Sequence, residues 1–304
     1  MKPTLTFLTL FLTSLLSASL LGGCRHEEEE LFIADKIPLN VEDSLAIMDL
    51  YDALKLNINL TEPWTLRHPD LWKGVSFDYD EASGKRFISG IDIYVKGNLA
   101  DSIPPSLGNL SHLRYLRIEG LNCSKNFTIP KEIFNCPLVA LKLSNEPLLK
   151  VSHKGFWDDY NDIKGISGKI PDEIYNVRNT LKVLEITHTN ITQLSVRIPE
   201  LQNLEVCRLD YNKLNGCVPP DLRLLNCRAD VSFNYYDSYQ WQTLELGGNM
   251  PIITCNYISN FVPDEILEKY FDIIRAEIYP QCNSHLMSYL EYWDWNRKHG
   301  SNGS

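Results

Sequence analysis

The chain has 304 residues, a length that suits one large domain or two ordinary ones. Hydrophobic residues make up 44% of it and charged residues 22%, a composition that excludes a disordered or fibrous chain. The formal net charge of −10 at pH 7 disfavours nucleic acid and anionic membrane surfaces as main partners, because both bind clustered positive charge.

The start of the chain carries the features of a bacterial lipoprotein signal. Lys2 precedes an apolar run over residues 5–21. The sequence LGGC that ends at Cys24 resembles a lipobox, in which the chain is cut before a cysteine that then carries a lipid. We therefore expect residues 1–23 to be a signal peptide and Cys24 to anchor the protein in the bacterial outer membrane. A permanent membrane-spanning anchor is the alternative, with the run at the short end of the ~17–25 residues that it needs.

An acidic tether is expected over residues 24–40. It contains four consecutive glutamates at residues 27–30, and like charges in a row repel one another and extend the chain. The run also resembles the acidic export signal of surface lipoproteins in Bacteroides and related bacteria. That resemblance implies a protein exposed on the cell surface.

Five copies of the pattern Leu-x-x-Leu-x-Leu follow, each with an Ile-Pro or Val-Pro pair behind it, and a sixth, degenerate copy starts near Cys227. The alternating apolar positions predict a short strand in each copy, and the proline predicts a turn. One copy cannot bury its own apolar side, so the copies must stack with their strands in a parallel sheet. The copies begin at Ile88, Leu113, Leu138, Leu181 and Leu204, and the proline pairs begin at Ile103, Ile129, Ile170, Ile198 and Val218.

Asn190 and Asn212 follow the last apolar strand position of their copies, where an asparagine can bond backbone groups of neighbouring turns. The combined pattern resembles plant-type leucine-rich repeats, LxxLxLxxNxLxGxIPxxLxxL, over residues 87–235. This resemblance implies an α/β solenoid, a leucine-rich-repeat horseshoe with a parallel β-sheet on the concave face and a helical cap at each end. The pattern has a departure at residues 191–197, which lack the usual glycine.

The resemblance extends to residues 41–86, which are similar to the N-terminal cap of plant-type repeats. That cap is a helix followed by the motif CxWxGVxC. Asp70 and Phe77 stand in the places of its two cysteines, so the resemblance implies a cap held by packing instead of a disulfide. The apolar stripe of the expected helix consists of Leu45, Met48, Tyr51 and Leu54.

Residues 236–304 are expected to form a C-terminal cap and tail. Beyond Cys24 the chain has seven cysteines, an odd number that leaves at least one unpaired. Cys255 and Cys282 are the candidate disulfide. A helix is expected to open near Pro263, with Ile266, Tyr270, Ile274 and Ile278 on one side.

Two columns of side chains are expected on the solvent-facing side of the sheet. Neighbouring strands lie ~4.8 Å apart, so one residue from each strand forms a continuous column. Opposite charges within the first column predict a ladder of ion pairs, each worth ~0–1 kcal/mol, and the alternative is a polar docking strip for a partner. The ion pairs expected are Asp92–Arg117, Lys142–Glu185, Glu185–Arg208 and Arg208–Asp230. The second column consists of Tyr94, Glu119, Ser144, Thr187, Asp210 and Ser232.

The copy that begins at Leu138 is longer than the others because it contains an insertion at about residues 146–168. Aromatic and acidic side chains on a loop suit stacking against a sugar ring or a hot spot for a protein partner. The alternative is that the aromatic residues pack the loop onto the solenoid. The candidate binding residues of the insertion are Phe156, Trp157, Asp158, Asp159 and Tyr160.

Catalytic motifs are absent from the sequence, which has no GxSxG, HExxH, phosphate-binding loop or GxGxxG. Cys207, Cys217 and Cys227 fall at three different parts of the repeat, so they do not predict a metal site. We therefore predict a surface protein without catalysis, cofactor or metal that mediates binding or adhesion to a protein or glycan. The alternatives are an accessory or catalytic component of carbohydrate capture and degradation, and a structural envelope protein.

Overall fold

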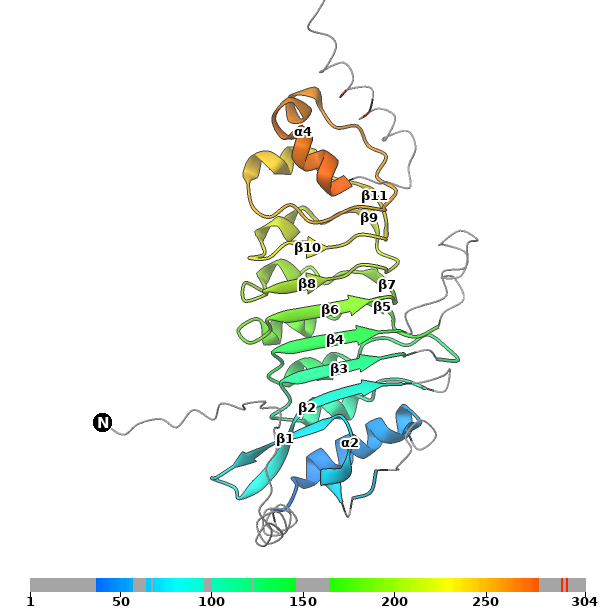
Figure 1. Ribbon diagram of the computed structural model, residues 1–304, viewed down its shortest axis with the longest axis vertical. Coiled ribbons are helices and arrows are strands. Elements are labelled where there is room, and N and C mark those ends of the chain that lie inside the picture. Colours follow the sequence, from blue (N-terminus) through cyan, green and yellow to red (C-terminus); the bar gives the residue numbers. More distant parts are fainter. Residues whose placement is uncertain are drawn as a thin grey trace, which may run out of the picture. The chain divides into compact units, whose positions relative to one another are not determined.

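Seven strands form the main sheet of this computed structural model, stacked one above another along the chain (Figure 1). The structure describes residues 37–56, 64–66, 68–95, 100–121, 123–145 and 164–278, together with Glu291 and Asp294. From β2 onward the strands are parallel to one another, as the repeats predict, and β1 pairs with β2 in the antiparallel direction. The strands in sheet order are β1 (Val75–Asp80), β2 (Lys85–Tyr94), β3 (Tyr115–Glu119), β4 (Ala140–Ser144), β6 (Val183–Thr187), β8 (Val206–Arg208) and β10 (Ala229–Asp230).

Short 3₁₀ helices follow the strands and cover one face of the main sheet. Most of them begin at or beside a predicted proline pair, because proline fixes its own φ and suits the first position of a helix. Their apolar residues join those of the strands in one buried core. These helices are η2 (Pro105–Asn109), η3 (Lys131–Asn135), η4 (Asp172–Val177), η5 (Ile198–Glu200), η6 (Pro220–Leu224) and η7 (Trp241–Leu246), and η1 (Pro69–Leu71) precedes β1.

Two small sheets lie on the flank of the solenoid, on the side where the strands of the main sheet end (Figure 1). β5 (Ser167–Lys169) pairs with β7 (Asn190–Gln193), and β9 (Asn215–Cys217) pairs with β11 (Tyr235–Ser238). Both pairs are parallel and join successive units. We call them the flank sheets.

The helix α2 (Val41–Ala53) precedes the repeats, and the side chain of Asn40 accepts hydrogen bonds from its first turn. The predicted stripe is wrong in one member, because Leu45 is 62% exposed. The buried face instead includes Asp43, whose carboxylate accepts a hydrogen bond of 2.6 Å from the backbone N of Ile88. This long-range bond between the helix and β2 sets which face of α2 turns inward.

Packed aromatic rings hold the region between α2 and β1, as expected for a segment without the cysteines of the plant-type cap. Trp64 lies between Tyr51 and Trp72, with ring centroids 5.6 Å and 5.7 Å away. Trp72 in turn contacts Phe77 at 6.2 Å. Asp70, in the other cysteine place, forms an ion pair with Arg86.

The helix α4 (Asp264–Ile278) follows the repeats and buries Ile266, Leu267, Phe271 and Ile274. Capping by α2 and α4 and a horseshoe curvature remain predictions. Within the described residues, no helix has both the length and the apolar character that a membrane crossing requires.

Candidate functional site

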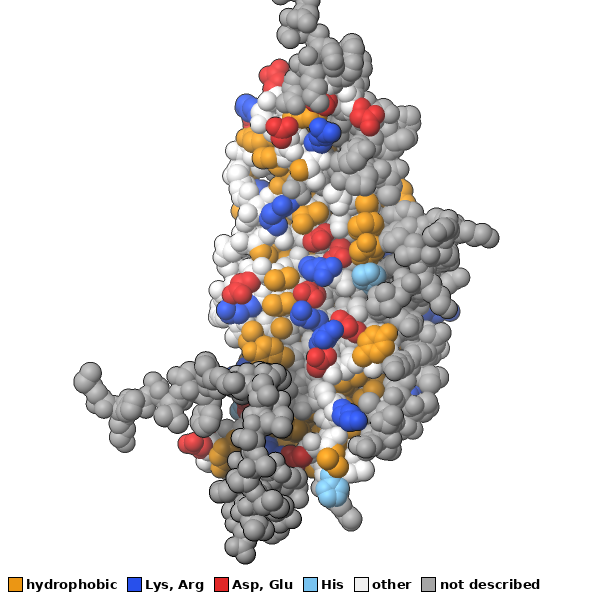
Figure 2. Space-filling view, viewed as in Figure 1, with side chains coloured by type: hydrophobic (Ala, Val, Ile, Leu, Met, Phe, Trp, Pro, Cys, Tyr) orange, Lys and Arg blue, Asp and Glu red, His pale blue; other side chains and the backbone are white. Residues whose placement is uncertain are grey.

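The candidate site is the side of the main sheet that faces away from the 3₁₀ helices, which we call the open face (Figure 2). The strand register aligns one charged residue from each of six successive strands, so the predicted column of charges is confirmed. The charge column consists of Asp92, Arg117, Lys142, Glu185, Arg208 and Asp230.

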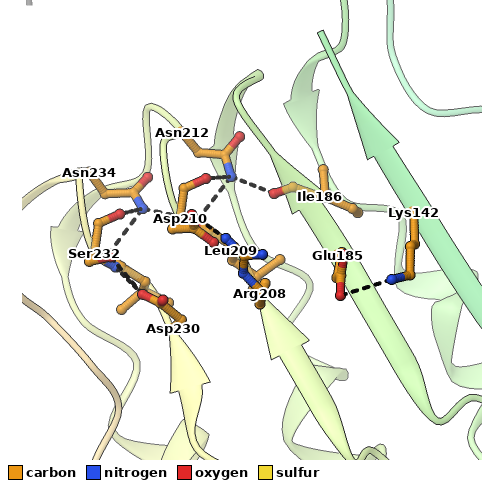
Figure 3. Close-up of polar contacts among 11 residues, drawn as sticks. Lys142, Glu185, Ile186, Arg208, Leu209, Asp210, Asn212, Asp230, Ser232 and Asn234 are labelled. Carbon is orange, nitrogen blue, oxygen red and sulfur yellow. Dashed lines mark hydrogen bonds and ion pairs between the residues drawn. The ribbon is translucent and has the colours of Figure 1, made fainter. Parts of the chain in front are cut away.

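Two of the four predicted ion pairs exist within the charge column. Arg117 lies 3.4 Å from Asp92, and Lys142 lies 3.2 Å from Glu185. The pairs predicted between Arg208 and its two neighbours in the column are wrong. The guanidinium of Arg208 instead forms an ion pair of 3.1 Å with Asp210, two residues further along the chain (Figure 3). Arg117 makes a similar second contact, at 2.9 Å to Glu119.

The second predicted column is only partly solvent-facing. Tyr94 is exposed, but Asp210 is 2% exposed, and Ser144 and Ser232 are buried as well. Burial raises the pKa of the Asp210 carboxyl, the charge of Asp230 adds to this, and the guanidinium of Arg208 opposes it. The Oδ1 atom of Asp210 has no hydrogen-bond partner in the described part of the chain.

Three rings form a continuous stack beside the charge column, and we call them the aromatic row. Tyr211 lies between His188 and Phe233, with ring centroids 4.4 Å and 4.2 Å away and interplanar angles of 11° and 8°. All three residues have left-handed backbones, with φ values of 55°, 56° and 52° in chain order. The predicted site did not include them, although they occupy the same place in three successive repeats.

Burial also changes the acid–base chemistry of the aromatic row. It lowers the pKa of His188 to about 4, and the nearby positive charge of Arg208 acts in the same direction. His188 is therefore neutral at pH 7 and stacks as an uncharged ring.

The left-handed backbones have a local cause, a ladder of buried asparagines that we call the asparagine ladder. Each ring precedes a ladder position, where the side chain turns inward to bond carbonyl groups of its own turn and of the previous unit. Asn212 Nδ2 donates to the carbonyl oxygens of Ile186 at 2.7 Å and Leu209 at 2.9 Å (Figure 3). Asn234 and Asn256 repeat this arrangement one and two units further along.

Asn190 does not take its predicted place in the asparagine ladder. The ladder position of its unit is held by Thr189, whose backbone N donates to Asn212 Oδ1 at 3.3 Å. Asn190 lies one residue later and donates to Asn126 Oδ1 at 3.4 Å. The spacing in the sequence favours Thr189, because one residue separates it from Thr187 of the second column, just as one residue separates Asn212 from Asp210.

A column of apolar side chains lies on the other side of the charges, and we call it the apolar column. The strand register aligns its members directly, and Tyr115 is the most exposed of them at 54%. The open face thus presents hydrophobic side chains on both sides of a strip of charges (Figure 2). The members of the apolar column are Tyr115, Ala140, Val183 and Val206.

The remaining candidate residues lie outside the described part of the chain. These are the lipidation site Cys24 and the insertion residues Phe156, Trp157, Asp158, Asp159 and Tyr160. Cys255 is described and Cys282 is not, so their disulfide remains a prediction. Among the described residues, no group of three histidine, cysteine or acidic side chains is arranged to hold a metal ion.

Solved structures resemble the chain at the level of the fold. A plant ice-binding protein is 23% identical, with a TM-score of 0.50, and the match covers 72% of this chain and 64% of that protein. The chain has a leucine-rich-repeat fold. Its strand, turn and 3₁₀ helix recur in register from unit to unit, as the sequence pattern predicts.

Plant receptor ectodomains are also similar, at lower scores. The LRR ectodomain of the receptor kinase SOBIR1 from Arabidopsis thaliana is 16% identical, with a TM-score of 0.40, over 74% of this chain and 95% of that one. A chain of the BIR3–SERK2 complex from Arabidopsis thaliana is 21% identical, with a TM-score of 0.48, over 69% and 97%. No family model matches the sequence, and the search of curated proteins found no relative.

Proposed function

We propose that the protein binds a protein partner through the open face, without catalysis, while the lipid on Cys24 holds it on the outer surface of the bacterial membrane. The aromatic row carries this proposal. It places three rings in a fixed array beside Arg208, and tyrosine and arginine are the side chains that most often dominate protein interfaces. The apolar column supplies further surface for the partner to bury.

The backbone of the aromatic row supports a functional reading. Each left-handed residue other than glycine costs about 1–2 kcal/mol, and glycine would adopt the same φ without that cost. The two ring contacts return only about 0.5–1.5 kcal/mol each. The ring contacts alone therefore do not offset the backbone cost at His188, Tyr211 and Phe233. Strained residues that persist in this way cluster at binding surfaces.

The charge column would contribute to the specificity of the same surface. Arg117, Lys142 and Arg208 already have carboxylate partners, so a partner protein would gain little by replacing them. Paired charges of this kind contribute to specificity and to the rate of association more than to affinity. We therefore expect the aromatic row and the apolar column to supply most of the binding energy.

A crosslinking experiment tests the proposal. A photo-reactive amino acid at Val206, in the apolar column, should capture a partner from intact cells or from the surrounding medium, identified by mass spectrometry. Tyr211→Ala should abolish this capture. Tyr175→Ala is the matched control, because Tyr175 is a tyrosine of η4 on the other side of the solenoid. Equal capture by both variants, with unchanged circular dichroism, would contradict the proposal.

Glycan binding by the insertion is the second candidate, favoured by its aromatic and acidic composition. A glycan array probed with the protein tests it. Selective binding that is lost on replacing Phe156, Trp157 and Tyr160, and kept in Tyr211→Ala, would assign binding to the insertion instead of the open face.

A further inference from the structure

A cavity of about 430 Å³ opens on the flank of the solenoid, where the two flank sheets fail to join. β7 and β9 belong to successive units, and Lys213 N donates to Ile191 O at 2.9 Å where they begin. Beyond that bond each strand pairs only with its other neighbour in the described chain. We call the cavity the flank pocket. Its walls include Gln193, Val196, Asn215, Cys217, Asp221 and Tyr236.

The gap between the two flank sheets arises from one long turn. Six residues separate Ile191 from Ile198, whereas three separate Ile166 from Ile170 and three separate Leu214 from Val218. The additional residues lie in the stretch that lacks the usual glycine. They are held in place by Ser195, whose Oγ donates to Asp172 Oδ1 at 2.7 Å. The turn that opens the pocket is therefore fixed by contacts within the solenoid.

The flank pocket is lined by one cation, Lys169, and one carboxylate, Asp221, and only the lysine has an ion-pair partner among the described residues. Lys169 is its only lining cation within the described chain, and it lies 2.7 Å from Asp172. The hydrogen bond from Lys169, followed by that from Ser195, lowers the pKa of Asp172, so this carboxylate is ionised and neutralises the lysine. Asp221 is exposed and has no ion pair or side-chain hydrogen bond with any described residue.

A largely buried tyrosine lies at the wall of the flank pocket. Tyr236 is only 2% exposed and lines the cavity, and its hydroxyl forms no hydrogen bond with any described residue. Burial raises its pKa, so the hydroxyl is neutral and can accept a hydrogen bond. Its oxygen is not among the fully buried unpaired atoms, so the hydroxyl is accessible from the cavity, where an occupant can donate a hydrogen bond to it.

We propose that the flank pocket binds a lysine or arginine side chain of a peptide or protein partner. The cationic head would lie near Asp221 and the hydroxyl of Tyr236, and its methylene stem would pack on Val196, Pro219 and Leu222. The volume falls within the ~300–1,000 Å³ of ordinary ligand sites and has room for one such side chain and its adjoining peptide groups. The net charge of −10 draws a basic segment towards the surface.

Protection of a thiol tests this proposal. Cys217 is exposed and lines the flank pocket, so an occupant slows its alkylation by iodoacetamide. The rate is measured by peptide mass spectrometry, with Cys227, which does not line the pocket, in the same sample as reference. The probes are a capped Gly-Lys-Gly tripeptide and the same peptide with norleucine, which keeps the stem and lacks the ammonium group, at equal ionic strength.

The lysine peptide should slow the modification of Cys217 severalfold, and the norleucine peptide should not. Asp221→Asn should raise the concentration for half-protection about fivefold, the upper end for an exposed ion pair. Glu268→Gln, which removes an exposed acid of α4, is the matched control and should have no effect. Equal protection by both peptides, an unchanged midpoint in Asp221→Asn, or stronger protection by methyl glucoside would overturn the proposal. None of these results bears on the Tyr211→Ala test of the open face.

Discussion

Asn234→Ala is expected to destabilise the protein more than any exposed asparagine substitution can. Asn234 is fully buried, and its Nδ2 donates to the carbonyl oxygens of Leu209 and Val231, each at 3.0 Å. Its Oδ1 accepts a bond of 3.0 Å from the backbone N of Leu214. The substitution removes all three bonds and leaves the backbone N of Leu214 buried without its partner, whereas the carbonyls of Leu209 and Val231 keep bonds from Asn212 and Asn256.

The magnitude follows from these three bonds. A hydrogen bond inside a protein contributes about 1 kcal/mol net, and a buried group left unpaired costs about 1–3 kcal/mol. We therefore expect Asn234→Ala to lower the free energy of unfolding by about 3 kcal/mol. Asn215→Ala is the matched control, because Asn215 is exposed and donates one bond of 3.2 Å to the carbonyl of Lys213. It should change stability by less than about 0.5 kcal/mol.

Urea unfolding provides the measurement, followed by circular dichroism and by tryptophan fluorescence, to which the buried Trp241 of η7 contributes. Two probes are needed because units of a solenoid can unfold separately. A loss below about 1 kcal/mol for Asn234→Ala, or an equal loss for Asn215→Ala, would refute the assignment of the ladder as a main source of stability.

Three further predictions concern the same scaffold. Because the pKa of His188 is about 4 in the folded protein and about 6.5 in the unfolded chain, the unfolded state binds the additional proton between these values. Stability should therefore fall as pH is lowered through this window, by about 2 kcal/mol between pH 7 and pH 5, and thermal unfolding of His188→Phe should lack this part of the pH dependence. Gly108→Ala should destabilise by about 1–3 kcal/mol in the same assay, because its new Cβ would overlap the backbone of Glu132 in the next unit. Gly216→Ala, with φ of 78° and open space around the new Cβ, should cost only about 1 kcal/mol of backbone strain.

The main sheet and the turns from which the 3₁₀ helices start could be predicted because their signals are local. Alternating apolar residues define each strand, and a proline pair marks where each following turn begins. The buried face of α2 could not be predicted in the same way. Its rotation depends on the hydrogen bond between Asp43 and Ile88, 45 residues apart, and the sequence of the helix alone does not indicate that contact.

In the candidate site, too, the features with local signals could be predicted and those set by tertiary contacts could not. The charge column followed from the repeat, but the partner of Arg208 did not, because Asp210, expected to face solvent, is buried. The rings of that row had a signal in the sequence, since His188, Tyr211 and Phe233 each precede a ladder position. For the flank pocket the signal was the missing glycine at residues 191–197, which marked an irregular turn and gave no indication of a cavity.

The asparagine ladder divides the solenoid into two halves with different opening behaviour. From Asn212 to Asn256, each side chain bonds carbonyls of two adjacent units, so no single unit can open without breaking bonds in the next. Towards the N-terminus, Asn145 still accepts a bond from Ile166, but its Nδ2 has no hydrogen-bond partner in the described residues. Amide hydrogen exchange should therefore release the units from β6 onward as one cooperative block, with a separate block before it. A partner that binds the aromatic row would touch only the block from β6 onward.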